Sequence, residues 1–319
     1  MCAEAVIEFL NATKIYGPTK KIGPVSLSID QGDVMGFLGP NGSGKTTCIR
    51  LLLGLMRPTS GSVKIRGLDP VSDHAVALRR VGYSPELPNI QSFLSPRELL
   101  SLVARGIEVP AGEINKQIDE VLELVGLTEY IDVKVSKFSK GMVQRLSIAQ
   151  GMIGNPDILI MDEPMIGLDP AGAAHFREVF QKFAKERGGT IFLSSHIMQE
   201  VESLCSSICM IHNGTMLFKG SVNQTISQVL GSNYVIVEVD PVEENVIKAV
   251  SKLPGVLSVR QMEPNGRTLE LKIDPAAEIR PLIAETIVKA GARLYSLSYS
   301  DNLLERTYIQ ALSQGKTVA

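Results

Sequence analysis

The feature that most constrains the fold of this 319-residue chain is a glycine-rich loop between an apolar segment and a run of helical periodicity. The apolar segment, Val34–Leu38, is typical of a strand buried on both faces of a parallel sheet. The loop after it matches the pattern G-x-x-x-x-G-K-[ST], whose backbone N–H groups surround phosphate oxygens at a helix N-terminus. The residues predicted to bind nucleotide here are Gly39, Pro40, Asn41, Gly42, Ser43, Gly44, Lys45, Thr46 and Thr47.

A second segment supplies the acidic groups that such a loop requires. The apolar run Ile158–Met161 is followed directly by Asp162 and Glu163. We expect Lys45 to reach the β- and γ-phosphates and Thr46 to bind Mg²⁺, with Asp162 beside the same ion at the end of its strand. Glu163 is then placed to polarise a water that attacks the γ-phosphate. Together the two segments predict ATP and Mg²⁺ as cofactors.

Strand-like and helix-like segments alternate over the first 220 residues, which predicts an α/β domain with a largely parallel sheet. A helical block at about 95–151 opens with Ser95-Pro96-Arg97-Glu98, the pattern of a capping box with proline at the first helical position. Further strands are expected at Ala5–Leu10, Val25–Ile29 and Thr190–Leu193.

A fresh pattern begins after Gly220, so we expect one domain over residues 1–220 and a second over 221–319. The second reads βαββαβ, which predicts a small α+β module of the ferredoxin-like type. Pro264-Asn265-Gly266 is a hairpin signal, and Asp301 can cap a last helix with Leu304, Tyr308 and Ala311 on one side. The expected strands and helices are Tyr234–Asp240, Val242–Leu253, Val256–Met262, Thr268–Ile273, Glu278–Ala290 and Arg293–Ser300.

Charge and composition exclude several classes of protein. The formal charge is −2, so the chain lacks the excess positive charge that supports non-specific binding to nucleic acid. No apolar run approaches the roughly 18–20 residues that cross a bilayer, and the first residues do not resemble a signal peptide. The four cysteines (Cys2, Cys48, Cys205, Cys209) lack zinc-site spacing, which favours a reducing, cytoplasmic compartment. Cys205 and Cys209 are expected on a helix over Val201–Ile208, as core thiols rather than a metal pair.

With these motifs in place, the chain resembles the nucleotide-binding subunit of ATP-binding-cassette (ABC) transporters, closely over residues 4–220. Within the family it is similar to the branch that includes drug exporters, sodium exporters and the ATPases of copper-site maturation. The resemblance implies a P-loop NTPase fold with a RecA-like core, an antiparallel β subdomain and a helical subdomain. It also implies an ATPase that drives a separate transmembrane permease subunit.

The segment Phe138–Arg145 resembles the signature motif of that family, whose usual form is Leu-Ser-Gly-Gly-Gln. Ser139 and Gly141 match it, whereas Lys140 and Met142 depart from it. A serine cap at a helix start offers free N–H groups and a positive dipole to an anion. The resemblance implies that Ser139 and Gly141 contact the γ-phosphate of an ATP held by the other protomer.

Three more segments resemble family motifs that surround the nucleotide. Gly167-Leu168-Asp169-Pro170 resembles the D-loop that touches the partner subunit, although Met165 stands where threonine is usual. His196 resembles the switch histidine that contacts the γ-phosphate and positions the water. Glu86 stands where glutamine is typical, in a loop that links the nucleotide site to the membrane subunit in this family. Its carboxylate still suits Mg²⁺, and a solvated loop glutamate remains an alternative.

An aromatic residue near the start of the chain resembles a further element of the family. Tyr16 resembles the residue that stacks on adenine, and a purely structural tyrosine at a strand end remains an alternative.

The resemblance implies a homodimer or heterodimer around two Mg·ATP, peripheral on the cytoplasmic face of the membrane, with no nucleic-acid partner. The alternative is a soluble ABC ATPase that acts on nucleic acid or ribosomes, which a single P-loop and the charge of −2 disfavour. A regulator without turnover is disfavoured by Glu163 and His196. The C-terminal region is expected to serve dimer contact or regulation, or to be a stabilising appendage.

Overall fold

The computed structural model describes residues 5–18, 21–222, 224–225, 233–263, 266–274, 278–300 and 303–314. The described chain forms two compact units, and the boundary between them lies between Ser221 and Val222. Some predicted features lie outside the described residues, namely those at Cys2, Pro264, Asn265, Asp301 and the side chain of Ala311.

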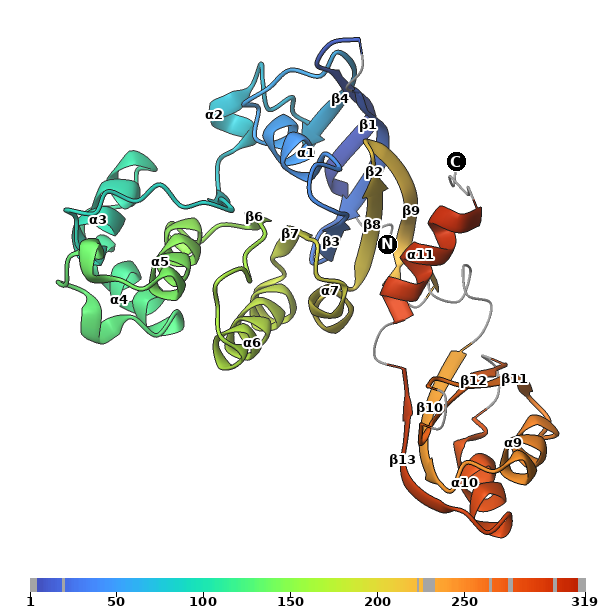
Figure 1. Ribbon diagram of the computed structural model, residues 1–319. Coiled ribbons are helices and arrows are strands. Elements are labelled where there is room, and N and C mark those ends of the chain that lie inside the picture. The colour runs from blue at the N-terminus through green and yellow to red at the C-terminus, as the bar shows by residue number, and fades with distance from the viewer. Residues whose placement is uncertain are drawn as a thin grey trace. The chain divides into compact units, whose positions relative to one another are not determined.

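The first unit is built on a six-stranded sheet in the order β5-β6-β7-β3-β8-β9. Figure 1 shows β6, β7, β3, β8 and β9 side by side in this order. The first five strands in this order are parallel, and only β9 runs antiparallel to its neighbour. All residues of β3, β6 and β7 are buried, which explains their unbroken apolar runs. The strands are β3 (Val34–Leu38), β5 (Val81–Ser84), β6 (Ile158–Asp162), β7 (Thr190–Ser195), β8 (Ser207–His212) and β9 (Thr215–Ser221).

A second, antiparallel sheet has the order β2-β1-β4 and shares a core with the central sheet and the helix α1. The rings of Phe9, Phe37 and Phe192 meet in this core. Bulges interrupt the in–out alternation of β1 near Asn11, whose φ is 51°. Because the alternation changes phase there, the sequence pattern predicts a strand that ends at Leu10, whereas β1 continues beyond it. The elements are β1 (Ala5–Ile15), β2 (Lys21–Asp30), β4 (Ser60–Ile65) and α1 (Lys45–Leu52).

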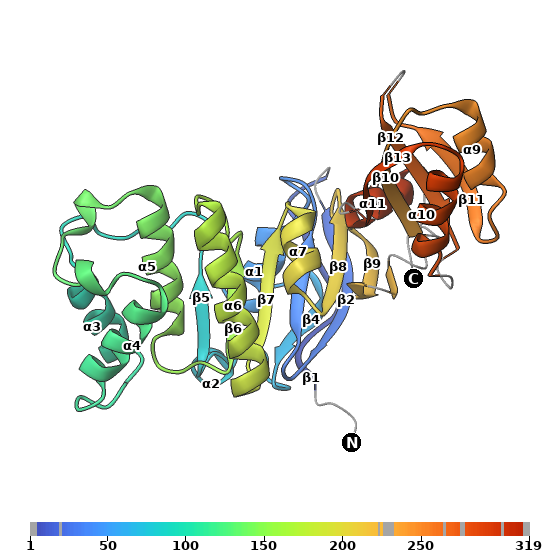
Figure 2. The same cartoon turned by 90° about the horizontal axis from the view of Figure 1, so that it is seen from below.

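Helices complete the first unit. Figure 2 shows α6 and α7 on one face of the central sheet, and α3, α4 and α5 together beyond β5. The predicted capping box is present, because Ser95 Oγ accepts a hydrogen bond from Glu98 N–H and Glu98 accepts one from Ser95 N–H. The helices are α2 (His74–Ala77), α3 (Pro96–Gly106), α4 (Ile114–Leu124), α5 (Lys140–Met152), α6 (Pro170–Arg187) and α7 (Met198–Leu204), with 3₁₀ turns at Thr128–Tyr130 and Val135–Lys137.

The helix predicted over Val201–Ile208 is confirmed for Val201–Leu204 but wrong beyond Leu204, where the two cysteines are expected on it. Helix α7 ends at Leu204, Cys205 is its extended C-cap, and Cys209 lies in β8. The chain leaves the helix because Ser206 N–H donates to Val34 O and so starts the pairing of β8 with β3. Cys48, Cys205 and Cys209 are free and buried, as expected for core thiols, and burial raises the pKa of Cys48 to about 12.

The second unit orders its elements as βαββαβ and ends in a further helix. Its antiparallel sheet has the order β11-β12-β10-β13. Alternate residues of β10 (Val235, Val237, Val239) are fully buried against Ile283 and Ile287 of a helix. The elements are β10 (Asn233–Asp240), α9 (Glu244–Ser251), β11 (Val256–Gln261), β12 (Thr268–Ile273), α10 (Arg280–Lys289), β13 (Arg293–Tyr299) and α11 (Leu303–Gln314).

No helix in the described residues is both long enough and apolar enough to cross a membrane. The predicted α/β fold with a largely parallel sheet, an antiparallel sheet and a helical segment is confirmed.

Candidate active site

The glycine-rich loop joins the end of β3 to the start of α1. Gly42 and Gly44 adopt left-handed backbone conformations, with φ of 80° and 114°, which glycine tolerates without strain. Gly44 is the N-cap of α1 and has no side chain to bond the first N–H groups of the helix. The free N–H groups of the helix start therefore remain available to an anion.

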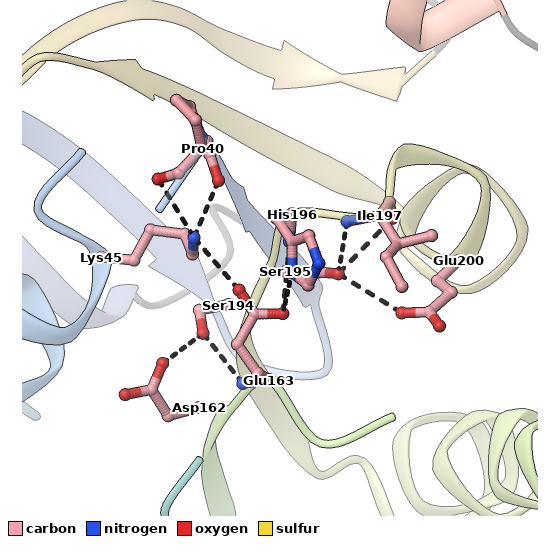
Figure 3. A network of polar contacts seen from close by, with 10 residues as sticks. Pro40, Lys45, Asp162, Glu163, Ser194, Ser195, His196, Ile197 and Glu200 are labelled. Atoms are coloured by element: carbon pink, nitrogen blue, oxygen red, sulfur yellow. Dashed lines mark hydrogen bonds and ion pairs between the residues drawn. The ribbon is translucent and has the colours of Figure 1, made fainter. Parts of the chain in front are cut away.

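Lys45 begins α1, yet its side chain is buried and turns back over the loop. Its ammonium donates to Gly39 O at 2.7 Å and lies 3.4 Å from Pro40 O. The same nitrogen lies 3.1 Å from Glu163 Oε1, an ion pair between side chains that are 6% and 4% exposed (Figure 3). A cation and a carboxylate are thus held together where the loop meets the end of β6.

The carboxylates come from the end of β6, and β7 holds them in place. Asp162 lies opposite Ser194 in the parallel ladder, and Ser194 Oγ donates to Asp162 Oδ1 at 2.5 Å. Ser194 Oγ also accepts a hydrogen bond from the N–H of Glu163 at 3.0 Å. Glu163 has a φ of 50°, a left-handed conformation that is uncommon outside glycine and often marks a functional site.

His196 follows β7 and contacts the second oxygen of Glu163. Its ring Nδ1 lies 2.9 Å from Glu163 Oε2, and its backbone N–H donates to the same oxygen at 3.3 Å. Glu163 therefore lies between Lys45 on one oxygen and His196 on the other, as Figure 3 shows. This arrangement brings an acid–base pair to the edge of the phosphate loop.

The backbone around His196 is held by a second hydroxyl. Ser195 Oγ accepts the N–H of Ile197 at 3.0 Å and lies 3.3 Å from Glu200 Oε2. Burial, with a smaller contribution from the charge of Glu163, raises the pKa of Glu200, and the hydrogen bond from Ser195 opposes this shift. Sequence reasoning missed Ser194, Ser195 and Glu200, because their roles depend on which strands and turns are neighbours.

The glycine-rich loop and the two carboxylates at the end of β6 border a pocket of about 300 Å³. It is lined by Asn41, Gly42, Gly44, Lys45, Thr46, Thr47, Glu86, Asp162 and Glu163. The structure thus brings together the glycine-rich loop, Asp162 and Glu163, and it also brings Glu86 to them from beyond β5. The Thr46 hydroxyl and the carboxylates of Glu86 and Asp162 are hard oxygen donors, which fit Mg²⁺.

The predicted adenine-stacking residue lies near this pocket without lining it. The Tyr16 side chain is 44% exposed, and its hydroxyl lies 3.1 Å from Thr47 Oγ1 and 3.2 Å from Met56 Sδ. The tyrosine hydroxyl therefore contacts the first turn of α1, next to the glycine-rich loop.

The two remaining predicted site residues lie elsewhere in the unit. Ser139 is the N-cap of α5 and accepts the N–H of Met142 at 3.2 Å. A Cβ on Gly141 would lie 3.0 Å from Gly167 O, so the helix start approaches the Gly167–Pro170 turn. Neither Ser139 nor Gly141 lines the pocket, so a single copy of the chain does not bring them to its own phosphate loop.

Comparison with known proteins agrees with this geometry. A family model described as "ABC transporter" matches residues 22–166. The bacitracin transport ATP-binding protein BcrA of Bacillus licheniformis is 44% identical over 212 residues, 66% of this chain and 68% of that protein. The uncharacterized ABC transporter ATP-binding protein YhcH of Bacillus subtilis is 34% identical over 98% of both chains. A solved structure of an ATP-binding subunit of an ABC transporter superposes with a TM-score of 0.65 at 28% identity, over 71% of this chain and 93% of that one.

Proposed function

Since this chain belongs to the ATP-binding subunits of ABC transporters, which hydrolyse ATP to power transport, we propose how its own residues perform that reaction. The observation that carries the proposal is the position of Glu163, held between Lys45 and His196 beside the phosphate loop. We assign Glu163 as the group that accepts a proton from the attacking water.

The ion pair of Lys45 with Glu163 suggests how binding prepares the base. The phosphates of ATP compete with the Glu163 carboxylate for the Lys45 ammonium, because each contact is a charge-assisted hydrogen bond or ion pair. When Lys45 turns to the phosphates, the Glu163 carboxylate loses its cation and becomes a better proton acceptor. His196 keeps its contact with Oε2 and so holds the carboxylate in position.

The residues of the pocket would also hold a divalent cation. Thr46, Glu86 and Asp162 would hold Mg²⁺, which would neutralise the charge that develops on the phosphate oxygens. The loop residues Gly39–Thr47 bind the phosphates through backbone N–H groups, and Tyr16 contacts the adenine.

ABC ATP-binding subunits dimerise, and we propose that this chain forms a homodimer around two Mg·ATP. Support comes from the N-terminal end of α5, where Ser139 and Gly141 present a capped helix start away from the pocket of their own chain. In a dimer these residues would contact the γ-phosphate bound by the other copy.

ABC ATP-binding subunits also work with separate permease subunits, and we propose that this chain docks on one at the cytoplasmic face of the membrane. The relative BcrA is named for bacitracin transport, which favours transport over the alternative of a nucleic-acid or ribosome ATPase. Co-purification with a membrane protein rather than with ribosomes or DNA would support this part of the proposal.

The variant Glu163→Gln tests the assignment of the base and the dimer together. Glutamine keeps the shape of the side chain but accepts a proton far less readily, so turnover should fall by about 10²–10⁴-fold. Binding should persist because Lys45, Thr46 and Asp162 still hold the nucleotide. Mg·ATP should therefore shift this variant from monomer to dimer in size-exclusion chromatography.

Adding Ser139→Arg should abolish that shift by blocking the start of α5. Parental turnover in Glu163→Gln would exclude Glu163 as the base. A dimer that survives Ser139→Arg would exclude the proposed sandwich.

A further inference from the structure

Ser194 lies at the point where the two acidic residues of the site meet. It is 0% exposed, and it is the residue of β7 that pairs with Asp162 of β6. Its hydroxyl donates to Asp162 Oδ1 at 2.5 Å and accepts from the N–H of Glu163 at 3.0 Å (Figure 3). One buried hydroxyl thus bridges two consecutive residues that the proposed mechanism uses differently.

The direction of both hydrogen bonds follows from the partners. An ionised carboxylate only accepts and a backbone N–H only donates, so the Ser194 proton must point to Asp162. From this geometry we propose that Ser194 is a positioning residue for ATP hydrolysis, which orients the metal-binding carboxylate and the water-activating residue through one hydroxyl. The proposal rests on the roles assigned above to Asp162 and Glu163.

The bond to Asp162 determines which of its oxygens faces the cation. Because Oδ1 accepts the bond from Ser194, the second oxygen is the one available in the pocket that Asp162 lines. Within the described part of the chain, the Asp162 carboxylate accepts a side-chain hydrogen bond from Ser194 alone. Without this hydrogen bond the Asp162 carboxylate could rotate. Its metal-binding oxygen would then face the pocket only part of the time.

The bond to Glu163 supports an unusual backbone conformation. Glu163 has a φ of 50°, and its N–H is shared between Ser194 Oγ at 3.0 Å and Ser194 O at 3.2 Å. Such conformations persist only where the surroundings hold them. The backbone direction at Glu163 sets where its carboxylate lies relative to Lys45 and His196.

The test compares Ser194→Ala with the parent chain in two measurements. Turnover should fall roughly ten- to a hundredfold, because a buried hydrogen bond to a charged group is lost. In calorimetric titrations, ATP affinity in EDTA should stay at the parental value, since Ser194 does not line the pocket. The Mg²⁺ concentration that half-saturates tight ATP binding should rise several-fold.

Two further variants separate positioning from general destabilisation. Ser194→Cys keeps the buried volume but offers only a weak donor, so it should show the same pattern in a well-packed chain. Thr190→Val is the matched control. Thr190 is a buried hydroxyl at the other end of β7 that accepts from Gly32 N–H at 3.0 Å, and its loss should leave turnover and Mg²⁺ dependence near the parental values.

A double-variant cycle shows whether Ser194 affects turnover through Glu163 or independently of it. In the Glu163→Gln background and at saturating Mg²⁺, which offsets the effect through Asp162, Ser194→Ala should lower the residual turnover by less than about threefold. The rise in the Mg²⁺ requirement should remain, because it acts through Asp162.

Three results would overturn the assignment of Ser194. These are parental turnover and Mg²⁺ dependence in Ser194→Ala, an equal loss in Thr190→Val, and a fully additive loss of turnover at saturating Mg²⁺ in the Glu163→Gln background. Failure of the proposed function is distinct, because it would appear as parental turnover in Glu163→Gln itself.

Discussion

Glu163 is a buried carboxylate with a charged or polar partner on each oxygen. The side chain is 4% exposed, and its two oxygens lie 3.1 Å from the Lys45 ammonium and 2.9 Å from the His196 ring. A buried charge is tolerated when it is paired, and removal of one partner leaves it uncompensated. Lys45 therefore has two roles in this site, as the proposed phosphate-binding cation and as the counter-ion of the proposed base.

Lys45→Ala should weaken nucleotide binding, whereas Glu163→Gln should leave it intact. The Lys45→Ala variant removes the cation that faces the phosphates, whose charge-assisted contacts contribute about 1.5–3 kcal/mol, so ATP affinity should fall roughly ten- to a hundredfold. Calorimetric titration with Mg·ATP measures this. Undiminished affinity would contradict the role of Lys45, and Arg66→Ala, a surface arginine of the same unit, serves as a control that should bind normally.

At the scale of elements, the contact between α5 and β5 joins the helical segment to the edge of the central sheet. A Cβ on Gly82 of β5 would lie 1.8 Å from Gly151 O of α5, and Ser84 Oγ hydrogen-bonds Ser147 Oγ at 2.9 Å. The strand ends two residues before Glu86, and the helix starts after Ser139. This packing contact therefore positions both Glu86, which follows β5, and Ser139, which precedes α5.

Gly82→Ala should destabilise the chain, because the added methyl group meets backbone rather than a movable side chain. Overpacking of this kind typically costs about 1–3 kcal/mol, and the free energy of unfolding from urea titration should fall by that amount. The matched control is Gly106→Ala at the end of α3, where no atom lies within 4 Å of the new Cβ. Equal stability of the two variants would show that α5 is not held by this close approach.

At the scale of the whole chain, the candidate site residues all belong to the first unit. The boundary near Ser221 separates them from the second unit, which has its own apolar core of strand and helix residues. A unit with its own core and sheet is expected to fold independently. We therefore propose residues 1–220 as the ATPase domain and 221–319 as an accessory domain that serves dimer contact or regulation.

A fragment of residues 1–221 should stay folded and bind Mg·ATP with an affinity close to that of the full chain, because it keeps every proposed ligand. Circular dichroism and calorimetric titration test this. Aggregation of the fragment, or loss of nucleotide binding, would show that the units are not independent. A weaker Mg·ATP-dependent dimer of the fragment in the Glu163→Gln background would assign dimer contact to the second unit.

The sequence alone determined those parts of the molecule whose chemistry is local. The glycine-rich loop, the strand that ends in Asp162 and Glu163, and the capping box at Ser95 are each encoded within a few consecutive residues. Periodicity likewise predicted most strands and helices, since burial imposes a period of two or 3.6 on neighbouring residues.

Tertiary structure decided which of these parts meet. Ser194 reaches Asp162 across 32 residues of sequence because β6 and β7 are neighbours in register, and no local pattern encodes that pairing. Helix α7 ends at Leu204 because Ser206 pairs with Val34, 172 residues earlier, although the sequence there continues a helical pattern. Contacts between distant segments depend on the order of strands in the sheet, which the packing of the complete chain determines.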